Sequence, residues 1–375
     1  MLDAGRINLR QLCLLIFISK NYLDLTYLLV LTYPPANQDV WLIVPLHFLF
    51  NLILMVPLYF LWLRFPQKTI VECGQLIAGK AAGLALGVLY IWYFIHQAAL
   101  ALSQFCEFLS TAIMPETPFI FFAVSLMLVS AYAVWHGLEV ISRVAELFAP
   151  MIIVSILIAV LLVSLSGNIN LKALFPMLEK GFLPVVYGGF LSSCKSIELI
   201  GIAMLLPCLN RRKKAKAAIV CGLLLHSLFF LIIALTVLGT FGASEAKNTV
   251  YPFYDAIRLI SVGRFIERVE IIYVMMWVLS AFIKVTLFYY LAVFGLSQLR
   301  LKDYKPFVLP VGTIIIPLSL LVAPNIVELL EFTSYKIYPW YNLLFIFLIP
   351  AVLLVVALIR KKEEDTQCGS ADLSR

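Results

Sequence analysis

Long apolar stretches recur along almost the whole chain, and they limit what it can fold into. Each is about as long as the roughly 20 residues that a helix needs to cross the hydrocarbon core of a bilayer. We count ten of them, at residues 9–32, 39–63, 82–109, 118–135, 144–166, 183–206, 216–241, 268–299, 307–323 and 338–359. They are continuous and do not alternate with a period of two, so the sequence predicts an all-α membrane protein with ten transmembrane helices.

The composition excludes a soluble protein. Of the 375 residues, 63% are hydrophobic and only 13% are charged, whereas a soluble domain has about 25% charged residues and needs a polar coat. The net charge of +7 could indicate nucleic-acid binding in a soluble protein. Here the basic residues lie at the ends of predicted helices, where they set topology and contact membrane lipid, so no nucleic-acid partner is expected.

The distribution of basic residues predicts the topology. With the N-terminus inside, 18 of the 28 Lys and Arg residues fall in inside loops or the C-terminal tail, 7 fall outside and 3 lie within spans. This asymmetry predicts ten spans with both termini cytoplasmic. The first apolar run carries Lys20 and Asp24 and has no small-residue cleavage site after it. We therefore interpret it as a retained first span rather than a signal peptide.

Two segments lie outside this scheme. The stretch 242–267 is too polar to span a membrane, but after Pro252 its apolar residues recur at helical spacing, which predicts a short helix lying over the outer end of the bundle. Residues 361–375 are charged and rich in small residues, which predicts a disordered cytoplasmic tail. The rest, residues 1–360, is predicted to be one transmembrane domain.

Polar residues interrupt two of the apolar stretches near their middle. In span one they are Ser19, Lys20, Asn21, Tyr22 and Asp24, and in span six they are Gly188, Gly189, Ser192, Ser193, Lys195 and Glu198. Each span places a lysine and an acid three or four residues apart, on one helix face. A charge at the centre of a membrane helix costs roughly 2.5–3.5 kcal/mol on insertion scales, so such residues indicate a functional site.

Spans one and six correspond to each other if the second five helices (about 183–359) repeat the first five (about 9–166) in inverted orientation. Transporters built in this way interrupt these two helices at mid-membrane and bind substrate there. The glycines and serines of span six supply the loose backbone and the hydroxyls that a broken helix needs. The alternative is that both lysine–acid pairs are structural ion pairs between helices.

Spans three and eight add further polar residues. Lys284 in span eight has no acid within one helical turn, so its partner must come from another helix, and Glu198 and Asp24 are the candidates. A structural ion pair and a functional role are both open for this lysine. Gln97 in span three is a further candidate for ligand binding.

Catalytic and metal-binding patterns do not occur. The sequence contains no phosphate loop, no nucleophile–base pair and no dinucleotide fingerprint. Its 7 cysteines form no CxxC pair, and its 4 histidines show no metal-ligand spacing. We therefore expect neither an enzyme nor a cofactor or metal site.

Three stretches together resemble the B-subunit of bacterial spore germinant receptors, within the amino acid–polyamine–organocation transporter superfamily. They are residues 137–150; Glu198 with the run from Pro207 to Lys214; and Tyr251-Pro252-Phe253 with residues 260–270, Trp277 and Phe282-Ile283-Lys284. The resemblance covers all ten spans. Where many members have a glycine-containing break in span one, this chain has Asn21-Tyr22-Leu23-Asp24.

The resemblance implies a ten-helix fold like that of the transporter LeuT, with spans one and six interrupted. It also implies a role in sensing germinants, usually amino acids, in the spore inner membrane, together with an A-subunit and a lipoprotein C-subunit. Glu198 and Lys284 match polar positions that recur in the family. We therefore expect a small nutrient to bind between spans one, three, six and eight. The alternative function is an amino-acid transporter of the same fold, coupled to H⁺ or Na⁺.

Overall fold

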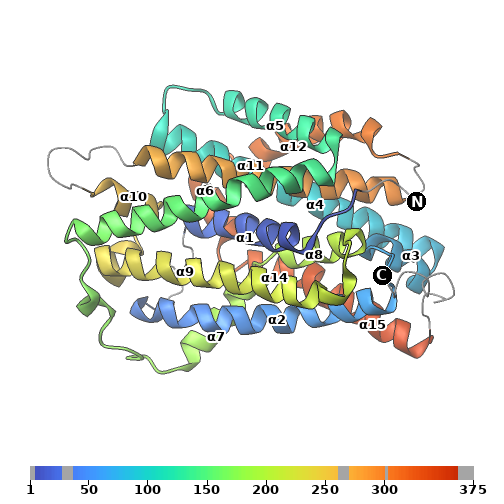
Figure 1. Cartoon of the computed structure of the whole chain (residues 1–375), viewed down its shortest axis with the longest axis horizontal. Coiled ribbons are helices and arrows are strands. Elements are labelled where there is room, and N and C mark those ends of the chain that lie inside the picture. Colours follow the sequence, from blue (N-terminus) through green and yellow to red (C-terminus); the bar gives the residue numbers. More distant parts are fainter. Residues whose placement is uncertain (1–4, 28–36, 261–269, 300–302, 362–375) are drawn as a thin grey trace.

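The computed structural model describes residues 5–27, 37–260, 270–299 and 303–361. Over these residues the chain is an elongated bundle of helices (Figure 1), and its only extended pairing is an isolated bridge between Ile7 and Leu209. The predicted tail, apart from Lys361, and most of the motif at 260–270 lie outside the described residues.

The long helices follow the predicted spans closely. They are α1 (Leu9–Thr26), α2 (Val40–Arg64), α4 (Lys80–Phe108), α5 (Phe119–His136), α6 (Leu138–Leu165), α7 (Leu183–Cys194) with α8 (Glu198–Leu205), α9 (Ala215–Ala246), α11 (Glu270–Gln298), α12 (Val308–Val322), and α14 (Tyr338–Leu343) leading into α15 (Ile349–Ile359). The shorter helices are α3 (Ile70–Ala78), α10 (Pro252–Arg258) and α13 (Ile326–Thr333).

Among the described residues, eight helical segments are long and apolar enough to cross a membrane, and the bent pair α7–α8 brings the total to nine. The predicted count of ten is reached only by including α1. That helix has 18 described residues, and they include the charged side chains of Arg10, Lys20 and Asp24, so length and composition alone do not identify it as a span. It lies in the centre of the bundle, where Lys20 and Asp24 face protein rather than lipid.

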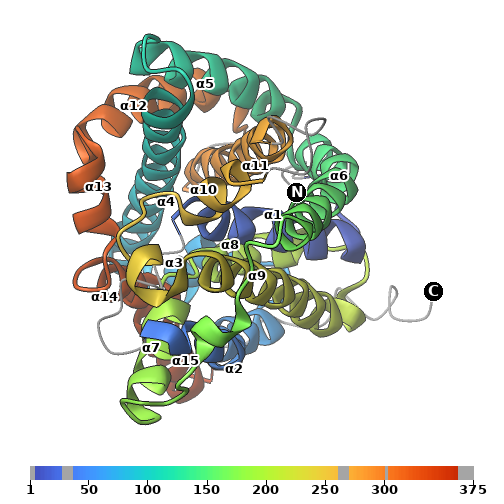
Figure 2. The same ribbon diagram turned by 90° about the vertical axis from the view of Figure 1, so that its left-hand side faces the viewer.

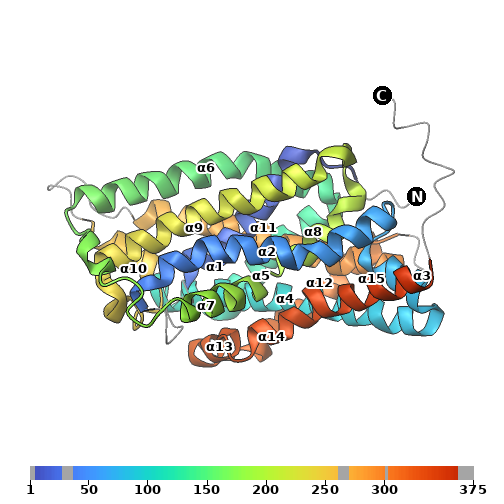
Figure 3. The ribbon, with the colours of Figure 1, turned by 90° about the horizontal axis from the view of Figure 1, so that it is seen from below.

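Figure 2, which views the bundle from its α10 end, shows α1 enclosed by α6, α9 and α11. The helices around α1 differ in burial: 67% of the most apolar part of α11 and 56% of that of α9 are buried, against 28% for α6, which equals the value for α12. From below, α13, α14 and α15 follow one another along an outer edge of the bundle (Figure 3). The centre of the bundle is therefore where polar side chains can avoid lipid.

Loops that were predicted to lie on one side of the membrane meet at one end of the bundle. The Arg360 guanidinium, after span ten, donates to the Ile77 carbonyl after span two at 2.9 Å. The Ile7 amide, before span one, donates to the Cys208 carbonyl after span six at 3.0 Å. At Gly137, between spans four and five, φ is +88° and an added Cβ would lie 2.8 Å from the Tyr304 hydroxyl, so only glycine fits this close contact.

The predicted outer loops meet at the opposite end. There Asp39, before α2, accepts a hydrogen bond from the Leu178 amide at 2.9 Å, and the hydroxyls of Thr111 and Tyr251 lie 2.9 Å apart. The predicted short helix is confirmed as α10, with Phe253 and Ile257 buried against the bundle. The two groups of loops lie at opposite ends of the bundle. Ile7, before span one, and Arg360, after span ten, belong to the same group, as an even number of membrane crossings requires.

Two helices of the described part were not predicted, because each is too short to cross a bilayer. For α3 the sequence did contain a readable signal: the Thr69 side chain and the Glu72 backbone amide form a capping box, which stabilises a helix start. For α13, Asn325 caps the first turn through the Glu328 amide at 3.0 Å. Both lie in connections between spans.

Candidate functional site

Span six is interrupted, as predicted. The helix α7 ends at Cys194, α8 begins at Glu198, and the two are bent by 45°. Gly188 and Gly189 lie inside α7 rather than at the break, and their role differs from the one expected. A Cβ on Gly188 would lie 2.6 Å from Ile43 Cδ1, and one on Gly189 would lie 2.7 Å from Leu46 Cβ. These glycines therefore let α7 pack closely against α2.

Span one is not interrupted at the predicted residues. The helix α1 is continuous through Ser19–Asp24 and reaches Thr26. Asn21 donates from its side-chain amide to the Phe17 carbonyl at 2.9 Å, and Thr26 donates to the Tyr22 carbonyl at 2.6 Å. Without a glycine or proline in this stretch, and with polar side chains bonded to the preceding turn, nothing forces the helix open.

The charges of spans six and eight form an ion pair in the interior. Lys284 Nζ lies 2.7 Å from Glu198 Oε1, and the two side chains are 2% and 3% exposed. Of the two candidate partners for Lys284, the structure selects Glu198. Ser19 of α1 joins them, because its hydroxyl donates to Glu198 Oε1 at 3.2 Å and its carbonyl accepts from Lys284 Nζ at 3.3 Å. Spans one, six and eight therefore meet at one buried charge pair.

The lysine and the acid of span one do not pair with each other. Lys20 Nζ donates to the hydroxyl of Ser196, in the break of span six, at 2.6 Å. Asp24 Oδ2 lies 2.6 Å from Nε2 of His226 on α9. Helical spacing puts Lys20 and Asp24 on one face of α1, but each finds its hydrogen-bond partner on a neighbouring span. These contacts hold α1 between the break and α9.

Two histidines extend this polar cluster. His47 Nδ1 on α2 lies 3.0 Å from the Ser192 hydroxyl on α7, and the His47 and His226 rings have centroids 5.6 Å apart. We did not identify either histidine from the sequence, because only metal spacings were considered. Their position in the middle of apolar spans was the available signal, since polar residues are expensive there.

A cavity of about 50 Å³, the space open to the centres of water molecules, adjoins these residues. Its lining residues are Lys20, Leu23, Asp24, His47, Ser192, Lys195, Ser196, Glu198 and His226. A water molecule needs about 10–15 Å³ by this measure, and typical ligand pockets have 300–1,000 Å³. The cavity therefore has room for a few waters or a small ion, but not for an organic nutrient without widening.

The lining comes from spans one, two, six and seven, whereas span three and span eight were expected to complete the pocket. Gln97 of span three bonds instead to span ten: its amide donates to Asn342 Oδ1 at 2.9 Å and its carbonyl oxygen accepts from Tyr338 at 2.7 Å. The structure thus places Gln97 in a helix–helix contact. Lys195 does line the cavity, with Nζ 5.8 Å from the centre of the Tyr335 ring.

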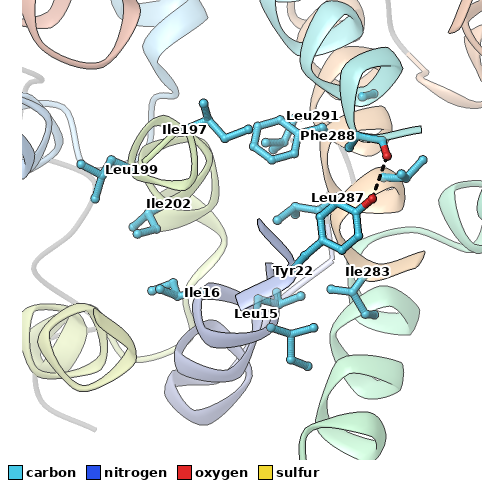
Figure 4. Packing of buried hydrophobic residues seen from close by; sticks show 14 of the residues in the cluster. Leu15, Ile16, Tyr22, Ile197, Leu199, Ile202, Ile283, Leu287, Phe288 and Leu291 are labelled. Carbon is cyan, nitrogen blue, oxygen red and sulfur yellow. Dashed lines mark hydrogen bonds between the residues drawn. The ribbon is translucent and has the colours of Figure 1, made fainter. Parts of the chain in front are cut away.

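The remaining predicted residues are packed rather than open. Tyr22 donates to the Ala101 carbonyl at 3.1 Å, and Lys284 Nζ lies 5.8 Å from the centre of its ring. Figure 4 shows Tyr22 surrounded by apolar side chains of α1, α8 and α11. Ser193 donates to the Phe190 carbonyl of its own helix at 2.7 Å. Both side chains therefore support the site from within the core.

Aromatic side chains close the outer end above the ion pair. Trp277, at the start of α11, stacks on Phe105 with ring centroids 5.4 Å apart and also contacts Phe108 at 4.3 Å. Its indole N–H donates to the Thr26 hydroxyl at 2.7 Å, and Phe108 meets Tyr251 at 4.8 Å. At the opposite end of α1, Arg10 pairs with Glu146 at 3.3 Å, and its side chain is 72% exposed. Aromatic side chains therefore cover the outer end of the site.

Comparison with solved structures shows the fold. The chain superposes on Mhp1, a nucleobase-cation-symport-1 family transporter solved in a closed conformation with bromovinylhydantoin bound, with a TM-score of 0.68. The alignment covers 96% of this chain and 80% of that one, at 13% sequence identity. The chain thus has the LeuT-like transporter fold that the sequence predicted.

Sequence comparisons identify the relatives. Spore germination protein KB of Bacillus subtilis (strain 168) is 30% identical over 375 residues, which cover 98% of this chain and 99% of the relative. The putative spore germination protein YfkT of the same organism is 25% identical, over 89% of this chain and 90% of the relative. The family model described as spore germination protein matches residues 6–327. The chain therefore belongs to the spore germination protein family, as an integral membrane protein with a transporter fold.

Proposed function

We propose that this chain is the nutrient-sensing membrane subunit of a bacterial spore germinant receptor. A small germinant, for which an amino acid is the best candidate, binds in the middle of the bundle between spans one, three, six and eight and triggers germination. The observation that carries this proposal is the buried pair of Glu198 and Lys284, which meets Ser19 beside the break of span six. Membrane interiors retain such costly charges where function needs them.

The pair supplies a physical trigger. A ligand shifts a conformational equilibrium only if it binds the two states with different affinity. Here one ion pair and two hydrogen bonds to Ser19 tie together α1, α8 and α11. A ligand whose own polar groups replace one of these contacts moves three helices relative to one another. The aromatic layer at the outer end and the small cavity require the site to widen when the ligand enters.

The relatives and the predicted topology support a setting for the receptor. Relatives named as spore germination proteins support a place in the spore inner membrane, with both termini on the core side. In this proposal the chain works with an A-subunit and a lipoprotein C-subunit, and bilayer lipid contacts the many exposed apolar residues of the outer helices. The two inverted repeats, about 9–166 and 183–359, move against each other.

Spores that carry Glu198→Gln test the proposal. The variant keeps the size of the side chain and removes the charge that holds Lys284, so we expect loss of the nutrient response while the protein remains in the membrane. Germination is followed by the fall in optical density for a panel of nutrients, and abundance by immunoblot of the inner membrane. Glu328→Gln, on the exposed start of α13, is the matched control. Normal germination of Glu198→Gln spores would refute the proposed trigger.

The second candidate is a transporter of the same fold, coupled to H⁺ or Na⁺. It is favoured by the likeness to Mhp1 and by the interior contact of Asp24 with His226, a pair that could exchange a proton. Uptake of labelled amino acids into proteoliposomes separates the two functions. Accumulation driven by an ion gradient would establish transport, whereas saturable binding without accumulation would establish sensing.

A further inference from the structure

A second cavity lies at the end of the bundle where the predicted inner loops meet. It has a volume of about 330 Å³ by the same measure as the first cavity, which is within the range of typical ligand pockets. Its lining residues are Asn8, Leu9, Arg10, Asn210 and Arg211. None of them belongs to the proposed germinant site, so this second cavity is a separate candidate for a binding site.

The second cavity is built on the joint between the start of span one and the end of span six. The Ile7 amide donates to the Cys208 carbonyl at 3.0 Å, and the Asn210 amide donates to the Ile7 carbonyl at 3.1 Å. These bonds hold the residues just before α1 beside those that follow α8. Arg10 and Arg211 thus reach one cavity from two distant segments of the sequence. A ligand that contacts both arginines therefore ties the ends of the two spans together.

The lining of the second cavity is basic and contains no acidic side chain. The Arg211 guanidinium is exposed and has no hydrogen-bond or ion-pair partner among the described residues. Arg10 contacts Glu146 of α6 through Nε at 3.3 Å, which leaves its two terminal nitrogens to bind another group. The segment 207–216 holds five basic residues and no acidic one. Because a guanidinium group offers a planar fork of donors that matches phosphate oxygens, the lining favours a phosphate group.

Apolar surface continues from the second cavity along the bundle. Figures 1 and 2 both show α1 lying between α6 and α9. On α6, Leu147 directly follows Glu146, the partner of Arg10. The exposed apolar side chains that continue along α6 and α9 are Leu147, Met151, Val154, Leu224 and Leu228. In a bilayer such faces contact acyl chains. A ligand that has a phosphate group and apolar chains therefore matches both parts of this surface.

We propose that the second cavity binds the headgroup of an anionic phospholipid. The phosphate lies between the guanidinium groups of Arg10 and Arg211, the side-chain amides of Asn8 and Asn210 donate to the headgroup, and the acyl chains lie along the exposed faces of α6 and α9. Because Arg10 belongs to α1 and Arg211 follows span six, the bound lipid holds the ends of these two spans together. Free phosphate has the same headgroup chemistry, and the adjoining apolar faces are the reason to assign a lipid. The proposal goes beyond nutrient sensing and does not depend on the identity of the germinant.

The test is a lipid titration of the purified full-length protein in neutral detergent, without any nutrient. Dioctanoyl phosphatidylglycerol or dioctanoyl phosphatidylcholine is added stepwise, and the midpoint of thermal unfolding is recorded. We expect a saturable rise with phosphatidylglycerol, because a ligand that binds only the folded state stabilises it. The rise with phosphatidylcholine should be much smaller, because its choline group cancels the charge of the phosphate. A third titration uses inorganic phosphate at constant ionic strength, and it should give no saturable rise, because phosphate alone has no acyl chains.

Variants locate the site. Arg211→Gln should weaken the apparent affinity for phosphatidylglycerol by about fivefold, the contribution of one basic residue near an anionic lipid surface. Since Arg211 is exposed, this variant should fold. Arg10→Gln should weaken the affinity to a similar extent and provides a second, independent comparison. Arg143→Gln is the matched control and should leave the affinity unchanged: like Arg10, Arg143 is 72% exposed and pairs with a glutamate of α6, but it does not line the cavity.

Three results would overturn the proposal. The first is an equal rise of the unfolding midpoint with phosphatidylcholine and with phosphatidylglycerol, which would mean that the protein responds to the acyl chains alone. The second is an equal affinity for phosphatidylglycerol in the wild type, Arg10→Gln and Arg211→Gln, or an equally large loss in Arg143→Gln, which would indicate a diffuse surface charge. The third is a saturable rise of the same size with inorganic phosphate, which would assign the cavity to a free anion.

Discussion

Removing either partner of the central ion pair gives the sharpest test of how this bundle is held together. In Lys284→Met the Glu198 carboxylate stays buried at 3% exposure without its counter-charge. Breaking one side of a buried pair typically costs about 3–5 kcal/mol. The unfolding entropy is about 2.1 cal/mol/K per residue, so 1 kcal/mol shifts the unfolding temperature of this 375-residue chain by about 1.3 °C. The expected fall is therefore about 4–6 °C.

The double variant Glu198→Gln/Lys284→Met distinguishes a charge effect from a packing effect. It removes both charges, so the penalty of an unpaired ion disappears and much of the lost stability should return. We therefore expect the double variant to unfold above either single variant, although it should still fail to respond to nutrient. The assay is thermal unfolding in detergent, with each variant also scored in spores. Additive effects of the two single changes, each under about 1 kcal/mol, would refute the reasoning.

Three further predictions follow from single contacts. Gly189→Ala should destabilise the protein by about 1–3 kcal/mol, because the added Cβ meets Leu46 at 2.7 Å and forces α7 away from α2; a normal unfolding temperature would contradict this. Gln97→Leu should lower stability by about 1–3 kcal/mol through the loss of its partner at Asn342, while the apparent affinity for nutrient in germination assays stays unchanged. Burial raises the pKa of Asp255 in α10, so the folded protein binds this proton more tightly than the unfolded chain and loses stability as pH rises from the unfolded pKa through the folded one. Asp255→Asn should remove that part of the slope of unfolding temperature against pH, and an unchanged slope would count against it.

Much of the fold could be predicted from the sequence because a bilayer leaves few choices. Every backbone polar group in hydrocarbon must be bonded within its own segment, so a long apolar stretch becomes a helix. Predicted boundaries such as 39–63 and 268–299 therefore lie within two residues of α2 and α11. The distribution of basic residues assigned each loop to one of the two sides of the membrane. The contact between Arg360 and Ile77 joins two segments that were assigned to the same side.

The sequence also singled out the positions of the site, because a charge in an apolar span is conspicuous. It did so for Lys20, Lys195, Glu198 and Lys284. It named Glu198 and Asp24 as the candidate partners of Lys284, and the structure selects Glu198, 86 residues away. It did not predict that Lys20 and Asp24 contact Ser196 and His226. His47 and His226 were missed although they too lie within apolar spans.

What the sequence by itself determined is therefore the helical bundle, its approximate topology and the places where polar groups interrupt it, since each follows from local transfer energies. Only the tertiary structure decided which charges meet, that α1 stays helical through Asn21 while span six breaks after Cys194, and that the cavity opens toward spans two and seven. The physical reason is that a buried charge is stabilised by whichever partner the packing of helices brings within about 3 Å, and that packing depends on residues far apart in the chain.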